Sequence, residues 1–352
     1  MSVLSEDNHE RALTIRQFCI LENMAVATYY KMRRLGYAEV KTPQLLPRDL
    51  WVQSGHWEKF GGNMFSVADD ERPMALKPMS CPCHVQIFNK GLRSWRELPL
   101  RYAEFGACHR NEPSGSLHGL MRTRGFEQDD AHVFCREEDV AGEIARFVSL
   151  LRGVYAQLGF SEPKVALSTR PQVRAGTDAL WDWAEETLGN AARMCGVVFD
   201  VQPGEGAFYG PKLDFALRDR LGRSWQCGTV QLDSVLPRRL DASYVRPDGS
   251  RAVPVMIHHA VFGAIGRFIA ILLEHYEGAL PFWLSPDQVA VAPISQTTRP
   301  TLQWCLRHSQ PTISGPSCSV VPKPCLVGSW RRMRRAFPWS PWSVAVNQNS
   351  GP

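Results

Sequence analysis

The densest group of reactive side chains lies between Phe105 and Phe134, in the stretch FGACHRNEPSGSLHGLMRTRGFEQDDAHVF. It combines arginines, carboxylates and histidines: Arg110, Arg122, Arg124, Glu112, Glu127, Asp129, Asp130, His109, His118 and His132. The turn-forming residues of PSGS and the glycine that follows predict a loop between two apolar strand ends. Arginine beside carboxylates is suited to binding a phosphate together with a cation. Taken as charge alone, the stretch is equally typical of a solvated surface loop.

The usual glycine-rich nucleotide loops are absent from the sequence. No G-x-x-x-x-G-K-[ST] pattern occurs, and the string GEGAFYG at 204–210 does not match G-x-G-x-x-G. If ATP binds this chain, arginine side chains must therefore hold its phosphates.

The elements that must position these residues follow from hydrophobic periodicity. Helical spacing predicts helices over 24–35, 136–158 and 265–276. Strand-like runs predict strands over 37–42 and 253–257 and an antiparallel hairpin over 212–233, with its turn at 219–223. Hairpin strands and helices mix without regular strand–helix–strand alternation. We therefore expect an α+β fold around an antiparallel sheet.

Charge divides the chain into a body and a tail. Seven of the 40 basic residues and none of the 35 acidic ones lie in 288–352, which leaves 1–287 with 33 basic and 35 acidic residues, a net charge of −2. The formal net charge of +5 therefore does not predict a globally basic nucleic-acid surface. Hydrophobic periodicity also fails beyond about Ser295. The tail is either a basic aromatic segment that binds nucleic acid or, more simply, a poorly folded end.

Composition indicates a cytoplasmic globular protein. Hydrophobic residues make up 44% and charged residues 21% of the 352 positions, which excludes collagen-like and largely disordered chains. No apolar run is long enough for a transmembrane helix, and the polar start is unlike a secretory signal. The ten cysteines are scattered, which favours reduced thiols.

Three motifs in order give the chain a resemblance to the catalytic core of the threonyl-tRNA synthetase family of class II aminoacyl-tRNA synthetases. Motif 1 spans about 24–46 and ends in GYAEVKTPQLL, motif 2 spans about 105–134, and motif 3 spans about 262–275 as FGAIGRFIAILLEH. The runs HRNEPSGSLHGLMR, GFEQDDAHVF, GEGAFYGPK, QCGTVQLD and PVMIHHA are close to threonyl-specific. The resemblance covers about 24–295.

The resemblance implies threonine–tRNA ligase activity with ATP, Mg²⁺, L-threonine and tRNA(Thr), in a homodimer that does not engage a membrane. Arg110 and Arg267 resemble the arginines of motifs 2 and 3 on the triphosphate, and His56 a histidine used in the transfer step. The further implied ATP contacts are Glu112, Arg122, Phe126 and Gln226. The implied threonine-binding residues are Met79, Gln128, Asp130, Tyr209 and Gln231.

The resemblance also implies one zinc ion per chain, held by Cys81, His132 and His258. Their wide spacing would not show a metal site by itself, because such residues are more often a buried thiol or a satisfied core histidine. Three protein ligands leave a position for the amino and hydroxyl groups of threonine. Valine lacks the hydroxyl and should be rejected strongly.

The chain departs from the family pattern at several positions. Cys83 replaces a glycine in SCPCH, where it would be strained if the backbone had positive φ. His259, Ala264 and Gly266 replace arginine, serine and glutamate near motif 3, and Gly266 should loosen the start of the last helix.

Two domains are expected: a catalytic core over 1–283, and a remnant of an α/β anticodon-binding domain over 284–352 that is poorly folded. The alternatives are a synthetase-like binding or regulatory protein without ligase activity, and a non-functional truncated gene product.

Overall fold

The computed structural model describes residues 31–68, 71–285, 289–291 and 318–320. The chain separates into two compact units that divide within the last helix, so that described residues 31–272 belong to the first and the remainder to the second. In the described part of the chain, no helix is both long and apolar enough to cross a membrane. The domain boundary expected at 283/284 stays a prediction.

An eight-stranded sheet forms the first unit, in the order β1-β6-β7-β14-β11-β10-β8-β9. Its strands are β1 (Ala38–Glu39), β6 (Leu100–His109), β7 (Gly125–Cys135), β8 (Lys164–Ser168), β9 (Asp200–Gln202), β10 (Lys212–Arg218), β11 (Ser224–Asp233) and β14 (Val255–Ala260). Neighbours are antiparallel except at the two edges, where β1–β6 and β8–β9 are parallel. The expected α+β class with an antiparallel sheet is confirmed.

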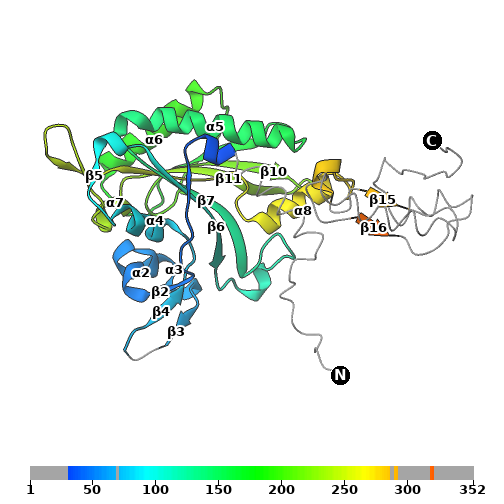
Figure 1. The fold of residues 1–352 in the computed structure, drawn as a ribbon, viewed down its shortest axis with the longest axis horizontal. Helices are drawn as coiled ribbons and strands as arrows, with labels where there is room; N and C mark the ends of the chain where they lie inside the picture. The colour runs from blue at the N-terminus through cyan, green and yellow to red at the C-terminus, as the bar shows by residue number, and fades with distance from the viewer. Residues whose placement is uncertain (1–30, 69–70, 286–288, 292–317, 321–352) are drawn as a thin grey trace, which may run out of the picture. The chain divides into compact units, whose positions relative to one another are not determined.

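Helices cover both faces of this sheet (Figure 1). The long helices α5 (Val140–Gln157) and α6 (Asp178–Met194) lie on one face. The short helices α2 (Arg48–Ser54), α3 (His56–Phe60) and α4 (Cys81–Phe88) lie on the other. This second face carries the site described below.

Smaller elements complete the described chain. The helices are α7 (Leu236–Arg239) and α8 (Ile265–His275), with 3₁₀ turns at Gly61–Asn63, Trp95–Glu97, Ser114–Ser116, Glu137–Asp139 and Phe282–Leu284. Two three-stranded sheets consist of β2 (Leu45–Pro47), β3 (Ser66–Val67) and β4 (Met74–Leu76), and of β5 (Arg93–Ser94), β12 (Tyr244–Val245) and β13 (Arg251–Ala252). In the second unit, β15 (Val289–Val291) pairs in parallel with β16 (Cys318–Val320).

The sequence patterns located most of these elements. The hairpin expected over 212–233 is the β10–β11 pair, and Asp219 closes its turn by accepting from the Arg223 backbone N–H. The helix expected over 136–158 begins with a 3₁₀ turn and continues as α5, with its predicted apolar face buried. In the first expected helix, residues 31–34 are helical and 24–30 lie outside the described residues.

Two strand predictions were wrong in their bounds. The strand expected over 253–257 is β14, which begins after Pro254, because proline has no N–H for the ladder, and continues through His258 and His259 to Ala260. The strand expected over 37–42 contains only the two residues of β1. Beyond β1, Thr42 instead bonds the Glu104 side chain, which ends the ladder.

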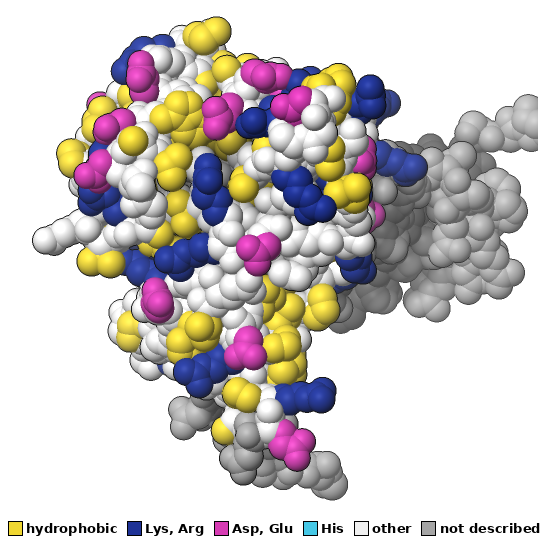
Figure 2. Space-filling view, turned by 90° about the vertical axis from the view of Figure 1, so that its left-hand side faces the viewer, with side chains coloured by type: hydrophobic (Ala, Val, Ile, Leu, Met, Phe, Trp, Pro, Cys, Tyr) yellow, Lys and Arg dark blue, Asp and Glu magenta, His cyan; other side chains and the backbone are white. Residues whose placement is uncertain are grey.

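Charges of both signs are interspersed on the face of the molecule shown in Figure 2. This agrees with the near-zero net charge expected for residues 1–287. A single-sign electrostatic surface is therefore not visible on that face.

Gly266 in the first turn of α8 supports a stability prediction. A Cβ there would lie 3.6 Å from the Leu120 carbonyl oxygen, an ordinary contact. Gly266→Ala is therefore expected to stabilise the fold by about 0.5–1 kcal/mol, because alanine loses less backbone entropy in a helix. Urea unfolding of the zinc-saturated protein measures this. Gly263→Ala is the contrast, since φ is +70° and a Cβ would lie 2.5 Å from the Cys227 carbonyl oxygen; a lower midpoint for Gly266→Ala would contradict the prediction.

Candidate active site

Three potential metal ligands meet on the face of the sheet covered by α4. Cys81 is the first residue of α4, His132 lies in β7 and His258 in β14. The antiparallel register of β7 and β14 sets His258 directly opposite His132. One ligand atom from each of the three lies within 4.8 Å of the others, and all three residues are buried. The sheet thus joins residues that are far apart in the sequence.

Hydrogen bonds orient both imidazoles. His258 Nε2 lies 2.9 Å from Asp233 Oδ2, and His132 Nδ1 lies 2.7 Å from His84 Nδ1. A carboxylate on the outer ring nitrogen is the usual partner of a metal-bound histidine, because it fixes the tautomer and leaves the other nitrogen free. The inner nitrogens, His132 Nε2 and His258 Nδ1, lie 3.0 Å apart.

The protonation states of the cluster suit a cation. Burial lowers the pKa of His132 well below its ordinary value, which keeps the imidazole neutral as a ligand must be. Burial also raises the pKa of the Cys81 thiol well above its ordinary value, so that a thiolate there needs a positive charge beside it. A cysteine and two histidines are a donor set that zinc accepts with one position left open. The three residues fit the zinc ion that the sequence implied.

Cys83 does not join the cluster and is not strained. It lies inside α4, and it is not one of the non-glycine residues with positive φ in the described chain. Residues two apart on a helix do not share a face, so the Cys83 thiol points away from that of Cys81. The expectation of strain depended on positive φ and does not apply.

Polar side chains expected to bind threonine surround the cluster. Asp130 Oδ1 lies 3.8 Å from His132 Nε2, and burial raises the pKa of Asp130 to about 6. The Tyr209 ring stacks on His258 with centroids 4.8 Å apart, and its hydroxyl donates to Gln231 Oε1 at 2.8 Å. Gln231 is itself the β11 register partner of His258.

The two other expected threonine contacts lie at the margin. Met79 is half-buried and precedes α4, packed against the core cluster that contains Cys81 and Tyr209. Gln128 lies two residues before Asp130 in β7 and so on the same face of the strand.

His56 lies next to the cluster. It is fully buried in α3, with Nε2 3.4 Å from Cys81 Sγ and Nδ1 2.8 Å from Ser54 Oγ. Burial lowers its pKa to about 3, so the ring is neutral at physiological pH. In this conformation it faces Cys81, not an open surface.

The arginines expected to bind ATP gather on the motif 2 loop and α8. The Arg110 guanidinium lies 5.1 Å from the centroid of Phe126, and its Nε donates to the Pro78 carbonyl at 3.2 Å. Arg267, in the first turn of α8, donates to the carbonyls of Met121 at 2.8 Å and Gln226 at 2.9 Å. Arg267 therefore joins the motif 2 loop to β11.

The remaining expected ATP contacts are close to these. Arg122 Nε lies 3.7 Å from Glu112 Oε2 in the motif 2 loop. The Gln226 side chain donates to Asp214 Oδ1 at 2.5 Å. Burial lowers the pKa of Arg267, and the positive charges of Arg122 and Arg110 lower it further. A cluster of like charges of this kind favours a polyanion between them.

Three residues were missed by the sequence analysis. Asp233 and His84 orient the imidazoles, and Trp225 faces the Arg267 guanidinium at 5.8 Å from its ring centroid. Asp233 ends QCGTVQLD, so its position after a strand was the available signal. Nothing in the local pattern marked the other two.

The fold and site define the class of protein. The model of the tRNA synthetase class II core domain (G, H, P, S and T) matches residues 65–276. The chain belongs to this family of class II aminoacyl-tRNA synthetases.

Within that class, the similar proteins are threonyl enzymes. The chain is 57% identical over 268 residues to a threonine–tRNA ligase from Methylococcus capsulatus, a match that covers 75% of this chain and 42% of that protein. A structure titled as the RNA-binding domain of the Cryptosporidium parvum Iowa II threonyl-tRNA synthetase has 38% identity and a TM-score of 0.81, and covers 92% of this chain and 80% of that chain. The Giardia lamblia prolyl-tRNA synthetase, at 17% identity and a TM-score of 0.64, covers 84% of this chain and 55% of that chain and shares the fold. The resemblance to threonyl-tRNA synthetases is confirmed, and the chain spans about two fifths of the length of the curated relatives it matches.

Proposed function

We propose that the chain is a threonine–tRNA ligase core that activates threonine with ATP and transfers it to tRNA(Thr). The carrying observation is the buried Cys81, His132 and His258 cluster, with Asp130 and Tyr209 beside it. A class II core alone would be shared by several amino acid specificities, whereas this donor set suits an amino acid with adjacent amino and hydroxyl groups.

Zinc would be held by Cys81, His132 and His258, and when bound it supplies a Lewis-acidic position that accepts an amine and a hydroxyl together. The chain's own residues complete the recognition. The Asp130 carboxylate would receive the substrate ammonium or hydroxyl. The hydrogen bond from Tyr209 to Gln231 keeps both side chains in place beside His258.

Activation requires the threonine carboxylate to attack the α-phosphorus of ATP, while the bond to the β-phosphate breaks and pyrophosphate leaves. The proposed part of Arg110 and Arg267 is to hold the phosphates and offset the charge that develops there. Phe126 would stack on adenine, and Glu112, Arg122 and Gln226 would hold the rest of the nucleotide, with Mg²⁺ carried by ATP. These residues position the reactants, since the protein forms no covalent bond to them.

In the transfer step, the terminal ribose hydroxyl of tRNA loses its proton and attacks the threonyl carbonyl, and AMP leaves. His56 is the proposed residue for this step, and its neutral ring could accept a hydrogen bond after it turns from Cys81. A homodimer through motif 1, and an anticodon-binding role for the segment after residue 283, complete the proposal on family grounds. Likeness to a threonyl-tRNA synthetase RNA-binding domain supports the tRNA part.

The test is ATP–pyrophosphate exchange by the purified protein, whose zinc content is measured first. We expect exchange with threonine, weaker exchange with serine, which carries both ligand groups, and none above background with valine. A folded, zinc-loaded protein without threonine-dependent exchange would favour the alternative of a synthetase-like binding protein. An unfolded or zinc-free product would favour a non-functional gene product.

A further inference from the structure

A buried carboxylate next to the proposed substrate ligands has a different task. Asp129 precedes Asp130 in β7, so their side chains point to opposite faces of the sheet. Asp130 points toward the metal cluster. Asp129 accepts hydrogen bonds from three consecutive backbone N–H groups: Val261 at 2.8 Å, Phe262 at 3.0 and 3.1 Å, and Gly263 at 2.8 Å.

The other face of this loop is fixed as well. The hydroxyl of Tyr155, from α5, donates to the Val261 carbonyl at 2.8 Å and accepts from the Gly228 N–H at 3.0 Å. Gly263 approaches the Cys227 carbonyl so closely that a Cβ would lie 2.5 Å from its oxygen. The loop 261–263 is therefore fastened to β7, α5 and β11.

This loop leads directly into the helix that carries Arg267. Ala264 forms a β-bridge with Gln128, and α8 begins at the next residue. Arg267 follows within the first turn, with its guanidinium bonded to the Met121 and Gln226 carbonyls. Any movement of the loop would displace the start of α8 and take the guanidinium off those two carbonyls.

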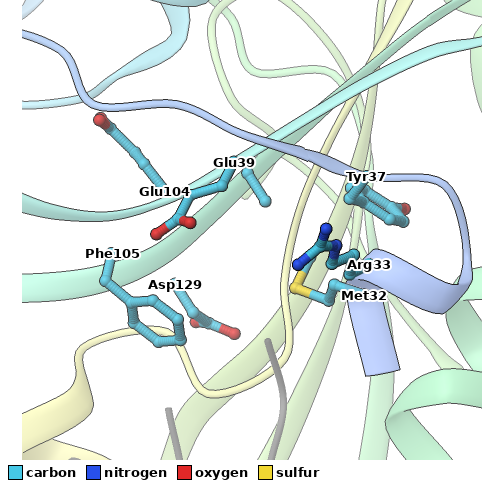
Figure 3. Close-up of a pocket in the computed structure, with 8 residues that line it drawn as sticks. Met32, Arg33, Tyr37, Glu39, Glu104, Phe105 and Asp129 are labelled. Atoms are coloured by element: carbon cyan, nitrogen blue, oxygen red, sulfur yellow. The ribbon is translucent and has the colours of Figure 1, made fainter. Parts of the chain in front are cut away.

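Asp129 does not reach the substrate residues itself. It lines a cavity together with Met32, Tyr37 and Phe105, and Figure 3 shows its carboxylate beside the Phe105 ring. None of the three proposed zinc ligands lines this cavity. Asp129 can therefore influence the reaction only through the loop it holds.

We infer that Asp129, with Tyr155 as a second anchor, is a positioning residue that sets Arg267 for ATP activation. This inference rests on the proposed function, since it takes Arg267 as an ATP ligand. The carboxylate is required because it offers acceptors to all three N–H groups. An asparagine would direct its own N–H₂ at one or more of them.

The experiment compares Asp129→Asn and Tyr155→Phe with Glu143→Gln in the zinc-loaded chain. Glu143 is a matched control, because it is a buried carboxylate that pairs with Arg101 at 2.6 Å and does not contact the loop. We expect the KM for ATP in exchange to rise about tenfold or more in Asp129→Asn and less in Tyr155→Phe. The KM for threonine, the zinc content and the control should change little.

Hydrogen exchange separates this inference from the proposed function. In Asp129→Asn, the amides of 261–263 should lose protection while those of β10 and β11 keep it. If the wild-type chain shows no threonine-dependent exchange, the proposed function fails, and the amide result still tests whether Asp129 holds the loop. If the wild type is active and both variants match the control in ATP KM, the inference is overturned. Equal rises in the KM for ATP and for threonine would overturn it too, because they indicate a general structural effect. Should Asp129→Asn fail to fold, Tyr155→Phe decides, since it removes a single hydroxyl.

Discussion

Replacing Arg267 by alanine is expected to lower kcat/KM for threonine-dependent exchange by about 10²–10³-fold, or about 3–4 kcal/mol. Two carbonyls already fix the plane of this guanidinium, at 2.8 and 2.9 Å. They use two of its five N–H donors, so the rest can meet phosphate oxygens without reorganisation. Preorganised donors of this kind stabilise charge as it develops in the transition state. Exchange kinetics at varied ATP measure the loss.

Two comparisons make this result specific. Arg267→Lys keeps a charge but lacks the planar fork that bonds both carbonyls, so it should recover only part of the loss. Arg136→Ala removes a guanidinium that pairs with Asp139 at 2.8 Å, outside the site, and should leave exchange unchanged. Near-wild-type exchange in Arg267→Ala would remove this residue from the proposed mechanism.

The extent to which sequence predicted the fold depended on how local the deciding interactions are. The β10–β11 hairpin was predictable because alternation and the 219–223 turn lie within one short stretch. β14 was predicted too short, because His258 and His259 interrupt its hydrophobic pattern although both are buried. Their burial depends on partners elsewhere in the chain: Asp233 for His258, and the Tyr37 hydroxyl, 2.6 Å from His259 Nε2.

The candidate site shows the same division. The metal cluster joins α4, β7 and β14, and only the sheet register brings His132 and His258 together. Spacing along the chain carries no trace of that register, so family resemblance was the only route to the three ligands. The orienting residues Asp233 and His84 were out of reach, because their role exists only once the imidazoles are placed. Gly266 was a clear departure in sequence, yet its effect on α8 depended on the space beside Leu120.

Replacing Cys81 by serine is expected to abolish both zinc binding and threonine-dependent exchange. Its thiol is fully buried, and its pKa is raised by that burial, so serine would offer a weaker ligand that resists ionisation even more. Loss of a partner that only orients a ligand costs about 10–100-fold in metal affinity, and loss of a ligand should cost at least about 100-fold. Competition with a chelator measures the affinity directly, without reference to activity.

Cys83→Ser is the matched control, because it changes a second buried thiol in the same helix that lies outside the cluster. It should keep about one zinc per chain and its exchange activity. Chelation of the wild type should lower its thermal midpoint, since a ligand at about 100 times its Kd contributes about 2.7 kcal/mol of stability. Added zinc should restore both midpoint and exchange in the wild type but not in Cys81→Ser. If Cys81→Ser binds zinc as tightly as Cys83→Ser, Cys81 is no ligand, and threonine selection in this chain must depend on Asp130, Tyr209 and Gln231 alone.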